Sequence, residues 1–274
     1  MSTMNNKIIT LALLVLSGAG SFYIMYQFPN NDWINIFYKS AQQILLFKSP
    51  FDIPSYMNPI WVAIMLTPFT LFTPEISRGM FGIISLSSSV FICYKLNISI
   101  KNSLLIILSA SVLQGFFQSN IEPVLLLGIF APASIALVIL MSKPQIGVGY
   151  FIYQLYWSYK EHRMIKTILP VVVLLILTLP YIPSIIQSGQ RVSSLSRNVS
   201  LFPYSIIPGI ILLAIAIYKK QPLLTICSSI LLSPYAALYT YTGIQLSIAV
   251  YGGKYKTPLL ITMLILTWIN EILI

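Results

Sequence analysis

Long, uninterrupted apolar runs decide what this chain of 274 residues can fold into. The runs 8–26 and 167–186 approach the length that a helix needs to cross a bilayer, which is about 20 residues. A transmembrane barrel would instead show alternating segments of about ten residues. With 57% hydrophobic and 8% charged residues and a mean hydropathy of +0.85, the chain has more apolar surface than a water-soluble core of this length can bury. The sequence predicts an all-α, polytopic membrane protein.

The apolar runs, taken in order, predict one integral membrane domain over residues 1–274 with about nine or ten spans. The first is 8–26, for which a cleaved signal peptide with small residues at 17–21 is the alternative. Lys7 before this run favours a cytoplasmic N-terminus. Asp32 then lies outside, in a protein that we expect in the plasma membrane.

The basic residues decide the rest of the predicted topology. The cluster at 160–166 and the pair at 219–220 predict cytoplasmic turns. Span counting places the turn bounded by Lys95 and Lys101 outside, whereas its lysines favour the inside, and the sequence leaves this conflict open. The other predicted spans are 60–72, followed by a cytoplasmic turn with Glu75 and Arg78, then 81–96, 104–117, 146–157, 167–186, 204–218, 223–241 and 257–274.

The net charge of +10 comes from sixteen Lys and Arg residues against six Asp and Glu residues. The basic residues are scattered between apolar runs, which suits anionic headgroups and phosphate-bearing lipids better than nucleic acid. Cys93 and Cys227 lie in apolar runs, and the single histidine, His162, lies in a charged cluster. We therefore expect no disulfide framework, metal site or Ser-His-Asp set.

The longest polar interval, residues 28–58, is the predicted active-site loop on the extracytoplasmic side. Asp32 stands at the start of a run in which apolar or small side chains recur every three or four residues, the pattern of an amphipathic helix in the membrane interface. The simplest role for Asp32 is therefore to cap this helix. The recurring side chains are Trp33, Ile36, Phe37, Ser40, Ala41, Ile44 and Leu45.

Other polar residues stand at the borders of apolar segments. Glu122 and Lys143 flank a very apolar segment that Pro132 interrupts, and a charge there needs a partner, a cavity or the interface. Each is thus a functional candidate, with interfacial snorkelling as the alternative for Lys143. Arg191 and Arg197 lie in a loop rich in Ser and Asn, a composition that suits a bound phosphate.

Several of these blocks together resemble the glycosyltransferase family 87-like, C-type (GT-C) membrane glycosyltransferases, over most of residues 28–241. The Lys-Pro-Gln block is the most specific of them. The matching residues are Asp32-Trp33 with Tyr38 and Ala41, Ser49-Pro50-Phe51, Asn58-Pro59-x-Trp61, Pro68, Asn120-Ile121-Glu122, Lys143-Pro144-Gln145, and Ser233-Pro234-Tyr235 with Tyr239.

The resemblance implies a GT-C helical bundle with interfacial helices and Asp32 as the general base. It implies an inverting hexosyltransferase, which moves a sugar from a polyprenyl-phosphate donor to a lipid or glycan acceptor outside the cytoplasm. The expected partners are membrane lipids, this donor and this acceptor, without cofactor, metal or nucleic acid. The candidates for substrate or phosphate contact are Lys143, Gln145, Glu122, Arg191, Arg197 and Asp52, of which Asp52 and Glu122 are also rivals of Asp32 as the base.

Two other classes stay open. A small transporter would place polar groups at broken helices near the bilayer centre. A non-catalytic membrane subunit or a degenerate transferase would use Asp32 only as a helix cap.

Overall fold

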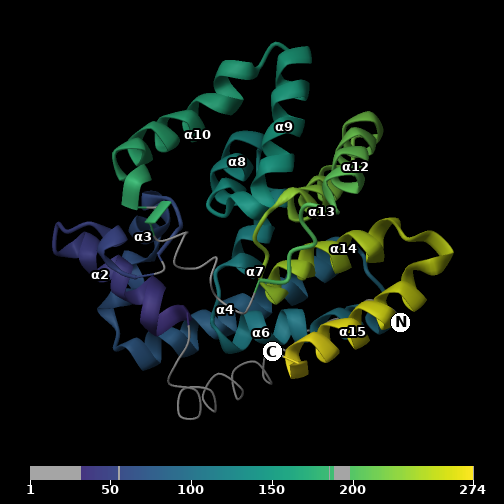
Figure 1. Cartoon of the computed structure of the whole chain (residues 1–274), viewed down its shortest axis with the longest axis horizontal. Helices are drawn as coiled ribbons and strands as arrows, with labels where there is room; N and C mark the ends of the chain where they lie inside the picture. Colours follow the sequence, from purple (N-terminus) through teal and green to yellow (C-terminus); the bar gives the residue numbers. More distant parts are fainter. Residues whose placement is uncertain (1–31, 55, 185, 188–197, 274) are drawn as a thin grey trace.

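The computed structural model describes residues 32–54, 56–184, 186–187 and 198–273, and every regular element in these ranges is helical (Figure 1). Three of the described helices are long and apolar enough to cross a membrane, and there is a fourth if a bent pair of helices counts as one span. The helical membrane architecture agrees with the prediction, whereas the count of nine or ten spans is not confirmed. These four are α4 (Pro74–Lys95), Met164–Ser184, Gly253–Leu273, and the pair α5 (Ile100–Ile107) and α6 (Ala110–Phe117), which bend by 54°.

The predicted amphipathic helix is formed by η1 (Trp33–Tyr38), a π-helical segment, and α2 (Lys39–Leu45). Its stripe faces inward against the short helices that follow, where Trp33 is fully buried and stacks on Phe81 at 4.2 Å between ring centroids. Leu45 at its end is exposed, contrary to the periodic pattern. The short helices are η2 (Pro50–Asp52), α3 (Ile60–Leu66) and η3 (Thr67–Leu71).

The prediction that residues 60–72 cross the membrane is wrong. The α-helix ends at Leu66, and a 3-10 segment with Pro68 in its first turn continues only to Leu71. The hydrogen bond from Trp33 Nε1 to Ser77 Oγ, at 3.0 Å, places the residues before and after this segment on the same side.

The beginning of α4 therefore lies beside the start of η1, not across a membrane from it. The Trp33 indole Nε1 donates to Ser77 Oγ at 3.0 Å, and Arg78 Nη2 donates to the Phe117 carbonyl at 3.0 Å. Glu75 and Arg78 belong to the first turns of α4 rather than to a separate turn, and Arg78 is buried.

Residues 122–141 fold back on themselves as a short helical hairpin. One arm is α7 (Glu122–Leu125) with η4 (Leu126–Phe130), and the other is α8 (Ala133–Met141), separated at Pro132 as the sequence predicts. The arms pack directly, because a Cβ on Gly128 would lie 3.0 Å from Ile139 Cγ2. The end of α8 therefore lies close to the start of α7.

Three longer hairpins extend away from α7, towards the top, the upper right and the right of Figure 1. The segment predicted as the span 223–241 is not one helix, because α13 ends at Leu232, two residues before Pro234. These hairpins are α9 (Pro144–Lys160) with α10 (Met164–Thr178) and η5 (Leu179–Tyr181), α12 (Ile206–Lys219) with α13 (Pro222–Leu232), and, after η6 (Leu238–Tyr241), α14 (Thr242–Tyr251) with η7 (Gly253–Tyr255) and α15 (Lys256–Leu273).

Candidate functional site

The Asp32 side chain does not cap the helix that it precedes. It makes no hydrogen bond to a backbone N–H of the first helical turn, and its own backbone is already helical. Its Oδ2 instead accepts a hydrogen bond from Asn120 Nδ2 at 2.8 Å, while its N–H donates to Gln118 Oε1 at 3.2 Å. The capping role predicted for Asp32 is therefore wrong, and its carboxylate faces the segment between α6 and α7.

Asn120 bridges two charged groups. Its Oδ1 accepts hydrogen bonds from Lys143 Nζ at 2.9 Å and from the Glu122 backbone N–H at 3.1 Å. Since an amide has one donor end and one acceptor end, these bonds and the bond to Asp32 fix its orientation. Asp32 and Lys143 are thus two hydrogen bonds apart although they are far apart in the sequence.

Lys143 and Glu122 form an ion pair inside the protein, with 2.9 Å between Nζ and Oε2. Lys143 is only 4% exposed and Glu122 only 1%, so the alternative of interfacial snorkelling does not hold for Lys143. Thr240 Oγ1 also donates to Glu122 Oε2, at 3.2 Å. Glu122 Oε1 is buried and has no hydrogen-bond partner among the described residues.

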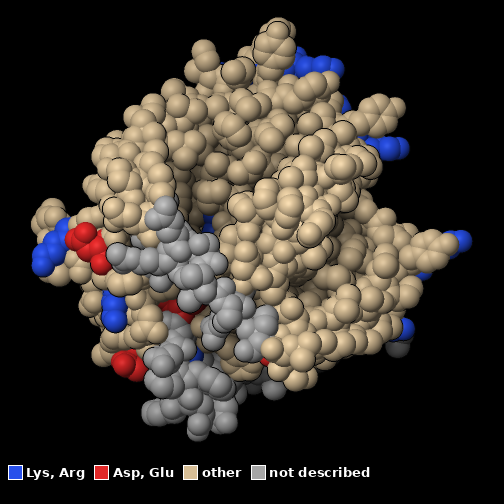
Figure 2. Space-filling model, viewed as in Figure 1, with Lys and Arg blue, Asp and Glu red and all other residues tan. Residues whose placement is uncertain are grey.

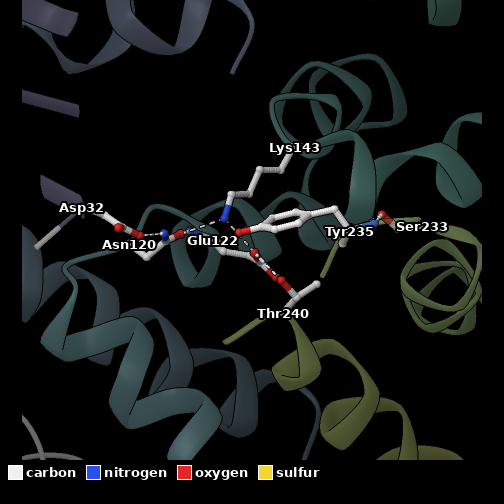
Figure 3. A network of polar contacts seen from close by, with 7 residues as sticks. All are labelled: Asp32, Asn120, Glu122, Lys143, Ser233, Tyr235 and Thr240. Carbon is white, nitrogen blue, oxygen red and sulfur yellow. Dashed lines mark hydrogen bonds and ion pairs between the residues drawn. The ribbon is translucent and has the colours of Figure 1, made fainter. Parts of the chain in front are cut away.

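Two tyrosines complete the surroundings of the Lys143 ammonium. Its Nζ lies 4.4 Å from the centroid of the Tyr239 ring, a cation–π distance, and Figure 3 shows Tyr235 extending toward the same ammonium. Burial raises the pKa of the Tyr239 phenol well above its usual value, and the nearby Asp32 and Glu122 charges raise it further. Tyr239 therefore stays neutral at physiological pH.

The network draws on separate parts of the chain, and Figure 3 shows the side chains of these parts pointing toward one another. Asp32 comes from the start of η1, Lys143 from the residue before α9, and Thr240 from η6. In the loop between α13 and η6, the Ser233 hydroxyl donates to the Tyr235 carbonyl at 2.5 Å. We call Asp32, Asn120, Glu122, Lys143, Tyr239 and Thr240 the polar network.

The structure brings together three of the predicted site residues, namely Asp32, Glu122 and Lys143. Asp52 is exposed at the end of η2, and Gln145 is half-buried in the first turn of α9. Arg191 and Arg197 lie outside the described residues, so their predicted phosphate contacts stay predictions.

Sequence reasoning did not assign roles to Asn120, Thr240 or Arg78. Asn120 and Thr240 are uncharged, and nothing in their spacing marks them as partners of a buried ion pair. Arg78 did have a signal, because it is a charged residue at the start of a long apolar run. Its guanidinium reaches the Phe117 carbonyl, close in sequence to the Gln118 and Asn120 side chains that bind Asp32.

The arrangement offers proton transfer and charge stabilisation. Among the described residues, no cluster of three or more His, Cys, Asp or Glu side chains could hold a metal ion. A carboxylate, an amide and an ammonium within hydrogen-bond reach of one another can accept a proton and stabilise an anion. In comparisons with known proteins, no protein-family model, curated protein or solved structure matches this chain.

Proposed function

We propose that this protein is a membrane glycosyltransferase of the GT-C type, in the plasma membrane with a cytoplasmic N-terminus. It would move a sugar from a polyprenyl phosphate to a lipid or glycan acceptor on the extracytoplasmic side, with inversion. The observation that carries the proposal is the orientation of Asp32, whose carboxylate turns away from its own helix to Asn120. A carboxylate that only capped η1 would not need this partner.

The proposed chemistry follows from the polar network. Asp32 accepts the proton of the acceptor hydroxyl while the acceptor oxygen attacks the anomeric carbon, and the bond from that carbon to the phosphate oxygen breaks. Proton transfer of this kind contributes about 10²–10⁴-fold to the rate. The leaving polyprenyl phosphate gains a negative charge, for which Lys143, Arg191 and Arg197 are the proposed cations.

Glu122 has a different role in this proposal from that of a rival base. Its Oε2 is already held by Lys143 and Thr240, whereas Oε1 is buried without a partner among the described residues. A buried carboxylate oxygen of this kind is suited to accept a hydrogen bond from a sugar hydroxyl. We therefore place Glu122 in donor binding and Asp32 in proton transfer.

Transfer from a synthetic donor tests the proposal. Purified protein would be incubated with a radiolabelled hexose on polyprenyl phosphate and with a membrane lipid extract as the source of acceptor. Release of polyprenyl phosphate would be followed together with the lipid-linked glycans of cells with and without the protein. We expect release that depends on the protein and a glycan that disappears without it. A folded protein that neither releases the lipid nor changes the glycans would contradict the proposal.

A small transporter is the second candidate, because the polar network lies where helices are broken. Lys143 and Glu122 are buried at the two ends of the α7–α8 hairpin, and α5 and α6 are bent by 54°. Transporters place substrate and ion sites at such breaks. Protein-dependent flux of a sugar or ion into proteoliposomes, without release of polyprenyl phosphate, would favour this candidate.

The ion pair also favours a non-catalytic subunit, in which the polar network only holds helices together. Lys143 is already paired with Glu122, and such a subunit needs no free cation. Neither transfer nor flux, together with loss of helix packing when the pair is broken, would favour that reading.

A further inference from the structure

The turns at the far ends of the three longer hairpins, together with the turn between α4 and α5, hold most of the cations in the described part of the chain. Nine of its thirteen Lys and Arg residues lie there, and eight of these nine are exposed. The only carboxylate among them is Glu161, which pairs with Arg163. Figure 2 shows basic side chains along the top right and right edges of the molecule. We call the nine residues the basic rim: Lys95, Lys101, Lys160, Arg163, Lys166, Lys219, Lys220, Lys254 and Lys256.

Every one of these four turns places a lysine ammonium near an aromatic ring. Lysines beside Tyr and Trp are typical of the headgroup level of a membrane, where the ring sits at the boundary and the ammonium reaches the phosphates. The distances from Nζ to ring centroid are 5.6 Å for Lys95 and Phe91, 5.0 Å for Lys160 and Tyr156, 5.8 Å for Lys219 and Tyr218, and 5.1 Å for Lys254 and Tyr255.

Trp157 joins two of the turns into one site. The Nζ of Lys220 lies 4.2 Å from its ring and the Nζ of Lys160 lies 5.9 Å from it, so ammoniums from two different hairpins converge on one indole. The Trp157 Nε1–H is buried and has no hydrogen-bond partner among the described residues. Two exposed ammoniums that converge in this way suit an anionic oxygen, such as that of a phosphate.

The fold also places the turn with Lys95 and Lys101 in the basic rim. Because α4 begins beside Trp33, its other end, at Lys95, lies one long helix away from the polar network. The turn packs beside the α14–α15 turn, where Thr257 Oγ1 donates to Asn102 Oδ1 at 3.0 Å. If residues 60–72 do not cross the membrane, span counting also places the turn with Lys95 and Lys101 on the cytoplasmic side, in agreement with its lysines.

We propose that the basic rim binds anionic phospholipid headgroups of the cytoplasmic leaflet, centred on Trp157 with Lys160 and Lys220. Membrane lipid is the occupant because the cations are exposed at the ends of apolar helices whose sides are also exposed, for example at Ile165 and Ile207. The cytoplasmic leaflet is the one enriched in anionic lipid and faced by basic turns. The proposal does not depend on glycosyl transfer.

Retention of lipid by the purified full chain tests the binding. Wild type and Lys160→Gln/Lys220→Gln would be placed in nanodiscs of phosphatidylcholine with a minor share of phosphatidylglycerol, and the retained anionic lipid would be counted by native mass spectrometry. The matched control is Lys39→Gln/Lys48→Gln, which removes two exposed lysines away from the rim. We expect the rim variant to bind phosphatidylglycerol about tenfold or more weakly, and the control and Lys160→Arg/Lys220→Arg to bind it as wild type does.

Three results would overturn the proposal. Equal loss in the rim variant and the control would mean that only total charge matters. Retention of phosphatidylcholine equal to that of phosphatidylglycerol would show that the headgroup charge does not drive binding. Competition by inorganic phosphate at millimolar concentration would assign the site to a free phosphate instead of a lipid.

Thiol labelling in intact cells tests the side of the membrane. The native Cys93 and Cys227 are buried, so the wild-type chain serves as the blank. An impermeant maleimide should label Lys39→Cys but leave Lys219→Cys and Lys101→Cys unlabelled until the cells are opened. Labelling of position 101 or 219 in closed cells would place the basic rim outside and refute the proposal.

Discussion

The polar network and the basic rim handle charge in opposite ways at opposite ends of the same hairpins. In the network, Lys143 and Glu122 are removed from solvent and satisfy each other. In the rim, cations such as Lys219 and Lys254 stay exposed and rest on aromatic rings. The comparison teaches that a lysine at the border of an apolar helix can be either buried in an ion pair or exposed beside an aromatic ring. Carboxylate and amide neighbours determine which of the two it is.

The largest effect on stability is expected when the buried ion pair is broken on one side. Lys143→Met leaves Glu122 charged and unpaired in the interior, which costs about 3–5 kcal/mol of the free energy of unfolding. Replacing both groups, as Glu122→Gln/Lys143→Met, should restore most of this loss. Unfolding of the purified variants in detergent measures both values, and a double variant no more stable than the single one would show that the pair is not the cause.

A smaller loss is expected where η1 meets α4. Ser77→Ala removes the acceptor of the buried Trp33 Nε1–H, and an unsatisfied buried donor costs about 1–3 kcal/mol. Ser85→Ala is the matched control, because its hydroxyl is equally buried in the same helix but has no partner among the described residues. Equal destabilisation by both changes would argue against the contact that places α4 beside η1.

The smallest effect is expected at the basic rim. Lys219→Gln and Lys254→Gln alter exposed side chains, whose individual contributions to stability are small. Their melting temperatures in neutral detergent should equal that of wild type. A marked loss in either variant would mean that the rim, like the network, holds the helices together.

The sequence predicts local features of this fold well. The period of Trp33, Phe37 and Ala41 gives the buried stripe of the N-terminal helix, and Pro132 marks the break of the short hairpin. Both follow from local geometry. The apolar run at 60–72 misleads because hydropathy does not reveal that its helix changes to a 3-10 segment at Thr67.

The site could be predicted only in part. Asp32, Glu122 and Lys143 can be identified as charges that border apolar segments, since an ionisable group there needs a partner, a cavity or the interface. Their pairing could not be foreseen, because it depends on how far the α7–α8 hairpin returns and on an uncharged bridge, Asn120. For the same reason the sequence offers helix capping for Asp32, where the structure has a tertiary partner.

Turnover of Asp32→Asn, measured beside its melting temperature, tests the central claim most directly. An asparagine oxygen can still accept the hydrogen bond from Asn120, so the fold should persist, whereas the proton acceptor is lost. We expect transfer from a polyprenyl-phosphate sugar to fall by two or more orders of magnitude, within the range of about 10²–10⁴ for a lost general base, with the melting temperature nearly unchanged and Asp52→Asn close to wild type. Wild-type turnover in Asp32→Asn, or its loss in Asp52→Asn instead, would contradict the assignment of Asp32 as the base.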